Sequence, residues 1–324
     1  MSESRGTPTP DPGSAGPVSS YHEPVLVAEV LEYLAPAGDG LYLDGTVGGG
    51  GHSHAILAAC DGCRLLAVDR DPDALAEARS RLEAFRPRVR FLHQRFHEAA
   101  EDPEVRDRGL DGALLDLGVS SHQLDADERG FAFRRGVGLD MRMNPQRGPT
   151  AAEFLARADE EELGTVFREL GEERRGRQLA REVVKRRQTE RVDTSDDLVA
   201  ALTVVLQRPP SPSEKARIFQ ALRIAVNREL EILEEALPAL RDVLVGGGTL
   251  VVLAYHSLED RIVKHAFREW SKACICPPQL PICTCRGEPL GETLTRKPVY
   301  PSDAEVERNP RARSARLRAW RKVA

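Results

Sequence analysis

Apolar and polar positions alternate along the first third of the chain in a pattern typical of strands followed by helices. "GLYL" at 40–43 predicts a strand, and the glycines at 48–51 separate it from an apolar helical stretch. "CRLLAVDRDPDALAEARSRLEAF" repeats this order, with a strand over 64–68 and a helix that Asp71 and Pro72 begin. "VRFLHQRF" and "LDGALLDLG" predict a third and a fourth strand.

Strands alternating with helices predict an α/β fold with a doubly wound parallel sheet, because parallel neighbours require crossover connections. In such a sheet, ligands bind at the carboxyl ends of the strands. The residues at or just after these ends are Asp44, Asp69, Phe96 and Asp116. We therefore expect a binding site among these four residues.

The alternation is interrupted, and the interruption divides the chain into four parts. Residues 1–20, rich in Pro, Gly, Ser and Thr, predict a disordered tail, and 21–124 form the first part of the sheet domain. Residues 125–213 contain charged helices but no convincing strand, which predicts an inserted helical subdomain. Residues 214–324 complete the sheet domain with one helix around 221–240, the strand "GGGTLVVLA" and a basic C-terminal segment.

The composition suits a globular protein, with 324 residues, 41% hydrophobic and 30% charged. No apolar run approaches the roughly 18 residues that cross a bilayer. The N-terminus lacks the basic and apolar regions of a secretory signal. We therefore expect a cytoplasmic protein without membrane contact.

Charge is unevenly distributed on this acidic chain, whose net charge is −5. Residues 174–191 contain eight Arg or Lys against two Glu, and 308–322 contain seven basic residues and no acidic one. Both segments are compatible with a phosphate-rich partner, and Trp320 would add a stacking surface for RNA. The alternative is a pair of solvated helices, the second burying Leu317 and Trp320.

The glycines at 48–51 suit the close approach of a ligand to a turn and to the first amides of a helix. Asp69 follows Gly51 by 18 positions, and its carboxylate would accept hydrogen bonds from both ribose hydroxyls of a nucleoside. The spacing departs from GxGxxG. A nucleoside-bearing cofactor is expected, either a nicotinamide dinucleotide or S-adenosylmethionine. A flexible turn, with Asp69 as a helix cap, is the structural alternative.

"DLGVSSHQLD" at 116–125 places an acid, two hydroxyls and an amide at the same edge of the predicted sheet. Methyl transfer needs mainly the alignment of an acceptor lone pair behind the methyl group. If the acceptor is the exocyclic amine of a base, Asp116, Ser120 and Ser121 would orient its N–H bonds. Alternatively, the two serines cap the segment that follows them.

Eight strings of the sequence carry a specific resemblance to a known family. They are "HEPVLVAEVLEYL" at 22–34, "DGTVGGGGHS" at 44–53, "AVDRDPDAL" at 67–75, "LDGALLDLGVSSHQLD" at 110–125, "RGFAF" with "LDMRMN" within 129–144, "FQALRIAVNREL" at 219–230, "HSLEDRIVK" at 256–264 and "NPRARSARLRA" at 309–319. The chain resembles the bacterial methyltransferases that modify N4 of a cytidine in 16S ribosomal RNA. Tyr255 stands where the family pattern has Phe.

The resemblance implies a Rossmann-like methyltransferase sheet with a helical insertion, S-adenosylmethionine as cofactor, and 16S rRNA or the small ribosomal subunit as partner. An NAD-dependent oxidoreductase and a non-catalytic RNA-binding assembly factor are the alternatives. The insertion would clamp RNA or pair with a second copy to form a homodimer. Carried over to this sequence, the cofactor contacts are Gly50, Gly51, His52, Asp69, Phe96, Asp116 and Gln123.

His256 and Asp260 follow the fifth predicted strand in "HSLEDR" and are candidates to face the acceptor. An imidazole is a suitable base at neutral pH, so His256 joins Asp116, Ser120 and Ser121 as a candidate catalytic residue. The alternative is that His256 hydrogen-bonds a loop carbonyl.

The six cysteines do not predict a disulfide framework in a chain of this length. Cys60 and Cys63 flank a helix-to-strand turn, and we expect small buried side chains there. The other four form two Cys-x-Cys pairs, six residues apart, which allow either a tetrahedral zinc site or reduced thiols in a proline-rich loop. Because CxxC is the usual zinc spacing, we expect reduced thiols and no metal. These four are Cys274, Cys276, Cys283 and Cys285.

Overall fold

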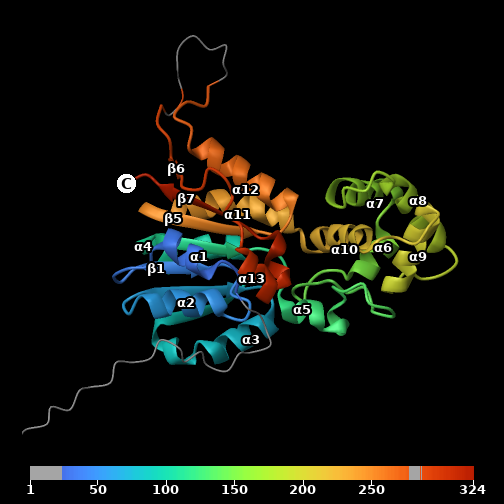
Figure 1. The fold of residues 1–324 in the computed structure, drawn as a ribbon, viewed down its shortest axis with the longest axis horizontal. Helices are drawn as coiled ribbons and strands as arrows, with labels where there is room; N and C mark the ends of the chain where they lie inside the picture. Colours follow the sequence, from blue (N-terminus) through green and yellow to red (C-terminus); the bar gives the residue numbers. More distant parts are fainter. Residues whose placement is uncertain (1–23, 277–284, 286) are drawn as a thin grey trace, which may run out of the picture.

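The computed structural model describes residues 24–276, 285 and 287–324; the tail predicted at 1–20 and Cys283 lie outside the described residues. A seven-stranded sheet carries helices on both faces, and a helical region extends to one side (Figure 1). The α/β prediction is confirmed. The strands are β1 (Leu41–Asp44), β2 (Arg64–Asp69), β3 (Val89–His93), β4 (Leu110–Asp116), β5 (Leu244–Ala254), β6 (Gly291–Thr293) and β7 (Arg316–Lys322).

The sheet has the order β3-β2-β1-β4-β5-β7-β6. The first five strands are parallel, with Leu43 beside Leu66 and Ala113, so their carboxyl ends meet at one edge. These five strands are the predicted ones. β7 is antiparallel to β5 and β6, and the sequence did not predict either of these last two strands.

The C-terminal segment corrects one prediction. Leu317 and Trp320 are fully buried within β7, so Trp320 offers no stacking surface for RNA. Its indole packs edge-on against Trp270, with ring centroids 5.2 Å apart. The segment that looked like a basic arm is a strand in which Leu317, Arg318, Ala319 and Trp320 are all buried.

The two faces of the sheet are covered by different helices. Tyr42 points to the face covered by α1, α2 and α3, whereas Leu41 and Leu43 point to the face covered by η2, α4, α11 and α12. On the first face lie α1 (Val27–Leu34), α2 (Gly51–Ala59) and α3 (Pro72–Arg81). On the second lie η2 (Phe96–Glu101), α4 (Pro103–Arg108), α11 (Glu229–Val243) and α12 (Ser257–Trp270).

The helical region has its own apolar cluster, which includes Leu155, Phe167, Leu179 and Leu202. The cluster also contains residues of α10, which the sequence placed with the sheet domain. The division into domains itself stays a prediction. The elements here are α5 (Ser121–Asp125), η3 (Asp127–Arg129), α6 (Ala151–Arg157), α7 (Glu160–Thr165), the π-helical turn η4 (Val166–Leu170), α8 (Gly176–Arg186), α9 (Ser195–Leu206) and α10 (Pro212–Asn227).

The single helix expected around 221–240 is two helices. Arg228 has a left-handed backbone, with φ of 51°, and this ends α10 and begins α11. The apolar stripe alone does not reveal the break, because it continues through both helices. The remaining short elements are η1 (Glu83–Arg88), α13 (Asp303–Arg308) and η5 (Pro310–Ser314). In the part of the chain that the structure describes, no helix is long and apolar enough to span a bilayer.

Cys60 and Cys63 are buried, as expected, but they form a disulfide across the turn between α2 and β2. The sequence did not predict this bond, because the six cysteines were not expected to form a disulfide framework. Their Cα atoms lie 5.6 Å apart, within the usual range for a disulfide, because the tight turn brings the helix end back to the strand.

Candidate functional site

A cavity of about 300 Å³ opens at the carboxyl ends of the parallel strands. Its volume is in the range of small-molecule sites. The structure brings together eight of the predicted site residues in its lining, but Gly50 and His256 do not line it. The eight are Gly51, His52, Asp69, Phe96, Asp116, Ser120, Ser121 and Gln123.

The glycines at 48–51 differ in why a side chain is disfavoured at each position. Gly48 and Gly50 have left-handed backbones, with φ of 49° and 78°. A Cβ on Gly50 would lie 3.3 Å from Cα of Ala78, so this glycine lets α2 approach α3. A Cβ on Gly51 would lie 2.8 Å from the ring of Pro24. Gly48 and Gly51 line the cavity, so only part of the run serves a ligand.

Asp69 ends β2, and both carboxylate oxygens are oriented by backbone amides. Oδ2 accepts from the N–H of Gly48 at 2.9 Å, and Oδ1 accepts from the N–H of Asp71 at 2.9 Å. Burial raises the pKa of Asp69 to about 6, although these two hydrogen bonds oppose the shift. Each oxygen keeps a lone pair for a further donor, so the carboxylate can bind the two hydroxyls of a ribose.

Asp116 ends β4 at the opposite wall of the cavity. Its Oδ1 accepts from the hydroxyl of Tyr255 at 2.8 Å, and its Oδ2 lies 3.6 Å from Nδ1 of His52. The Nε2 of His52 contacts the carbonyl oxygen of Val25 at 2.8 Å. Burial and the charge of Asp116 raise the pKa of Tyr255 well above its usual value, so the phenol stays a donor.

Ser120 caps the short helix α5. Its Oγ accepts from the N–H of Gln123 at 3.2 Å, and Oε1 of Gln123 accepts from the N–H of Ser120 at 3.1 Å. The capping alternative is therefore confirmed for Ser120, which also lines the cavity. Ser121 begins α5, is 9% exposed and lines the same wall.

Both the oxygen and the nitrogen of the Gln123 side-chain amide form hydrogen bonds within the protein. Its Nε2 donates to Oδ2 of Asp71 at 2.6 Å, an oxygen that also accepts from Arg129 at 2.8 Å. Arg129 is buried and donates further to the carbonyl oxygens of Arg142 and Met143. This network joins the end of β2 to α5 and to the loop around "LDMRMN". Gln123 therefore supports the cavity wall through this network.

His256 lies beside the site and caps α12. Its Nε2 lies 3.0 Å from Oε1 of Glu259, whose Oε2 accepts from the N–H of Tyr255 at 2.9 Å. Burial opposes ionisation of Glu259, but His256 and neighbouring charges hold its pKa below the usual value. Glu259 lines the cavity. Asp260 pairs with the buried Arg318 at 2.6 Å, so it does not face an acceptor.

Two cavity residues, Arg223 and Glu229, were missed by sequence reasoning. Nε and Nη2 of Arg223 donate to the two carboxylate oxygens of Glu229, at 2.9 and 2.8 Å. Asn227 does not line the cavity but is buried next to it along the chain, and its Oδ1 accepts from the N–H of Met143 at 2.8 Å. The string "FQALRIAVNREL" places Arg223 and Asn227 in the last turns of α10 and Glu229 at the start of α11, among several apolar residues. That pattern is the signal that could have identified them.

The whole chain is similar to proteins of one family. A family model described as the MraW methylase family matches residues 19–323. Ribosomal RNA small subunit methyltransferase H of Gemmatimonas aurantiaca is 50% identical over 309 residues, which cover 95% of this chain and 97% of the relative. The protein of the same name from Heliobacterium modesticaldum is 47% identical over 309 residues, 94% of this chain and 99% of the relative.

Among solved structures, an rRNA methylase from Streptococcus thermophilus aligns over 91% of this chain and 95% of its own, at 10% sequence identity and a TM-score of 0.41. The family assignment depends on the relatives with 47–50% identity and on the family model, not on this distant structure. The resemblance indicated by the sequence strings is confirmed. The chain belongs to the MraW methylase family.

Proposed function

We propose that the protein transfers a methyl group from S-adenosylmethionine to N4 of a cytidine in 16S rRNA of the small ribosomal subunit. The observation that carries the proposal is the cavity that Asp69, the glycine loop and Asp116 line together. The chain belongs to the MraW methylase family, and the two relatives described above are named ribosomal RNA small subunit methyltransferase H. Neither alternative, the NAD-dependent oxidoreductase or the non-catalytic assembly factor, finds support in these comparisons.

The residues present fit the cofactor. The carboxylate of Asp69 would accept from the ribose hydroxyls, and Gly48 and Gly51 leave room beside the loop backbone. Phe96 offers an apolar surface for the adenine on the β3 side. S-adenosylmethionine supplies an electrophilic methyl group on a sulfonium.

The acceptor side consists of Asp116, Ser120 and Ser121. These oxygens can accept from the amine N–H groups and orient the nitrogen lone pair. With S-adenosylmethionine bound, these oxygens would hold the amine while its nitrogen gained the methyl group in place of one proton; the proton would pass to solvent, and the sulfonium would become a neutral thioether. His256 is not included, because it does not line the cavity and its Nε2 lies 3.0 Å from Oε1 of Glu259.

The substrate must present its base outside the stack, because the cavity encloses the reacting groups within the protein. We infer a cytoplasmic site of action from the ribosomal substrate. Pairing of the helical insertion with a second copy stays a prediction.

The direct test is incubation of the full chain with methyl-labelled S-adenosylmethionine and small subunits that lack the modification. Digestion of the RNA then identifies the labelled nucleoside. Label in N4-methylcytidine is expected. Label in another nucleoside, or none on either subunits or free 16S rRNA, would contradict the proposal.

Two variants and one titration connect this activity to the cavity. Asp69→Ala should abolish labelling at limiting cofactor. Asp39→Ala, which removes an acid whose side chain is 95% exposed, should leave labelling unchanged. Calorimetric titration should show binding of S-adenosylmethionine and not of NAD.

A further inference from the structure

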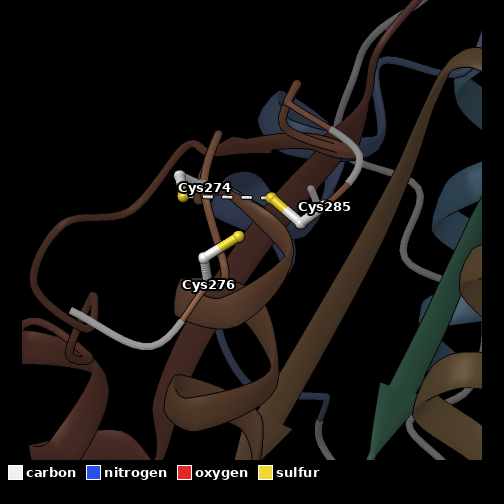
Figure 2. A group of neighbouring side chains, drawn as sticks. All are labelled: Cys274, Cys276 and Cys285. Carbon is white, nitrogen blue, oxygen red and sulfur yellow. Dashed lines mark hydrogen bonds between the residues drawn. The ribbon is translucent and has the colours of Figure 1, made fainter. Parts of the chain in front are cut away.

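Three cysteine sulfurs converge on the segment between α12 and β6. The Sγ atoms of Cys274, Cys276 and Cys285 all lie within 4.8 Å of one another. Figure 2 shows the three side chains pointing toward a common centre, two from the chain that leaves α12 and one from the chain that returns toward β6. Cys274 and Cys285, which are 11 positions apart in the sequence, therefore lie close together in space.

The spacing of the sulfurs matches tetrahedral zinc. A Zn–S bond of about 2.3 Å with tetrahedral angles separates two ligand sulfurs by about 3.8 Å. Sγ of Cys285 lies 3.9 Å from Sγ of Cys274. The sulfurs of Cys274 and Cys285 therefore need almost no movement to bind one ion. Three thiolates leave the fourth tetrahedral position for water or another ligand.

The backbone supports a thiolate at this place. The N–H of Ile275 points at Sγ of Cys285, with N and Sγ 3.4 Å apart. Such a hydrogen bond orients the sulfur as a metal ligand. Thiolates favour zinc or other soft ions and disfavour magnesium and calcium, which prefer oxygen ligands.

We propose that Cys274, Cys276 and Cys285 bind one zinc ion that joins the two arms of this segment. The site is structural, because Glu259, near the start of α12, lines the methyl-transfer cavity and the helix then runs about 17 Å before it reaches the cysteine segment. Each coordinating thiol releases its proton to solvent as its Zn–S bond forms, and no sulfur changes oxidation state. The inference is independent of the methyl-transfer reaction.

Metal content and cobalt spectroscopy test the site on the full chain. The protein is treated with a chelator, reduced with a phosphine, and titrated with Zn²⁺ or with Co²⁺. One equivalent of zinc per chain is expected, and Co²⁺ should give thiolate charge-transfer bands together with tetrahedral d–d bands. Failure of the reduced protein to bind zinc would overturn the proposal.

Single Cys→Ser variants at the three positions locate the ion. Each should weaken zinc binding at least a hundredfold, because removal of a ligand should exceed the 10- to 100-fold cost typical of losing a supporting contact. Ile275→Ala is the matched control, since this side chain is 52% exposed and lies between two ligands. It should bind zinc as tightly as the unchanged protein.

Far-UV circular dichroism and cofactor binding show whether the variants fold. Both should remain unchanged in all three serine variants. Zinc binding that persists in the triple serine variant would place the ion elsewhere and refute the assignment. Addition of zinc should also protect the peptide bonds next to Cys274 and Cys276 from proteolysis, and only in chains that keep the three cysteines.

Discussion

Two acids at strand ends illustrate how single residues acquire different roles in one cavity. Asp69 is held by the backbone amide of Asp71, two positions further on, and by that of Gly48, 21 positions earlier. Asp116 is instead held by a side chain, through the hydroxyl of Tyr255. The first arrangement depends on β1 lying beside β2, and the second depends on β4 lying beside β5.

Cofactor binding should depend on pH through Asp69. Its pKa of about 6 lies above the ordinary value of 3.8, so the carboxylate becomes protonated as pH falls through 6 and loses acceptor capacity. A ligand that requires the ionised form should bind roughly tenfold more weakly at pH 5 than at pH 7.5. Titration of S-adenosylmethionine at several pH values measures this.

The Asp69→Asn variant is the control for this pH dependence. It should bind the cofactor roughly 10- to 100-fold more weakly at pH 7.5, since hydrogen bonds to a charged group are worth about 1.5–3 kcal/mol. Its affinity should change little between pH 5 and 7.5. A tenfold drop in the variant's affinity for the cofactor between pH 7.5 and pH 5 would show that a group other than Asp69 causes the pH dependence.

Tyr255 and Asp116 should respond differently to substitution. Tyr255→Phe removes one donor to Asp116 and keeps the ring, a change toward the residue of the family pattern. It should cost about 1–2 kcal/mol of stability and leave turnover within about threefold. Asp116→Asn should reduce turnover at least a hundredfold. Denaturant unfolding and the methylation assay measure the two effects, and equal losses of turnover would contradict this distinction.

At the scale of elements, the short helix α5 forms one wall of the cavity. Only five residues long, it is marginal alone and depends on its capping box and on the contact of Gln123 with Asp71. Ser120 therefore has two possible roles, as a cap and as a contact to the acceptor base.

Substitution of the two serines separates these roles. The Ser120→Ala, Ser121→Ala double variant should lower turnover at least tenfold, while affinity for the cofactor stays within about threefold. Loss of the Ser120 cap should cost about 1 kcal/mol. Ser211→Ala removes a similar capping box from α10 and should cost comparable stability without loss of turnover. Unchanged turnover in the double variant would limit Ser120 to capping.

At the scale of the whole molecule, the insertion projects beside the carboxyl edge of the sheet (Figure 1). The basic segment 174–191 lies largely on α8. Arg174, Arg177 and Lys185 are exposed there, and none of them forms an ion pair with any other described residue. Their neighbour Arg181 pairs with Glu160, and Arg186 pairs with Glu182. The three unpaired cations are the best candidates for contact with rRNA phosphates.

Replacement of these three cations by alanine should weaken binding of the small-subunit substrate and leave binding of the cofactor unchanged. Each lost phosphate contact reduces the salt dependence of binding by roughly 0.7–0.9 in the log–log slope, so the slope should fall by about 2–3. The slope is measured from the apparent KM for small subunits at several salt concentrations. Alanine at Arg86, Arg106 and Arg268, three exposed arginines of the sheet domain, should leave the slope unchanged.

The parallel strands and the residues at their ends could be predicted from the sequence, because alternating and apolar runs reflect burial directly. Asp69 and Asp116 were identified as site residues for the same reason: each follows a buried run. The strand β7 could not be recognised, because its arginines resemble a solvated basic segment, whereas Arg318 is buried together with its apolar neighbours. Arg318 is buried only because Asp260, 58 positions earlier, is beside it.

The sequence by itself determined the fold class, the family and the edge of the sheet at which the site lies, since these follow from local periodicity and contiguous strings. Contacts between distant segments decided the rest. Gly50 serves the contact of α2 with α3, His256 turns to Glu259, and Cys274 meets Cys285. Such pairs depend on how elements pack in space, and no local pattern records that arrangement.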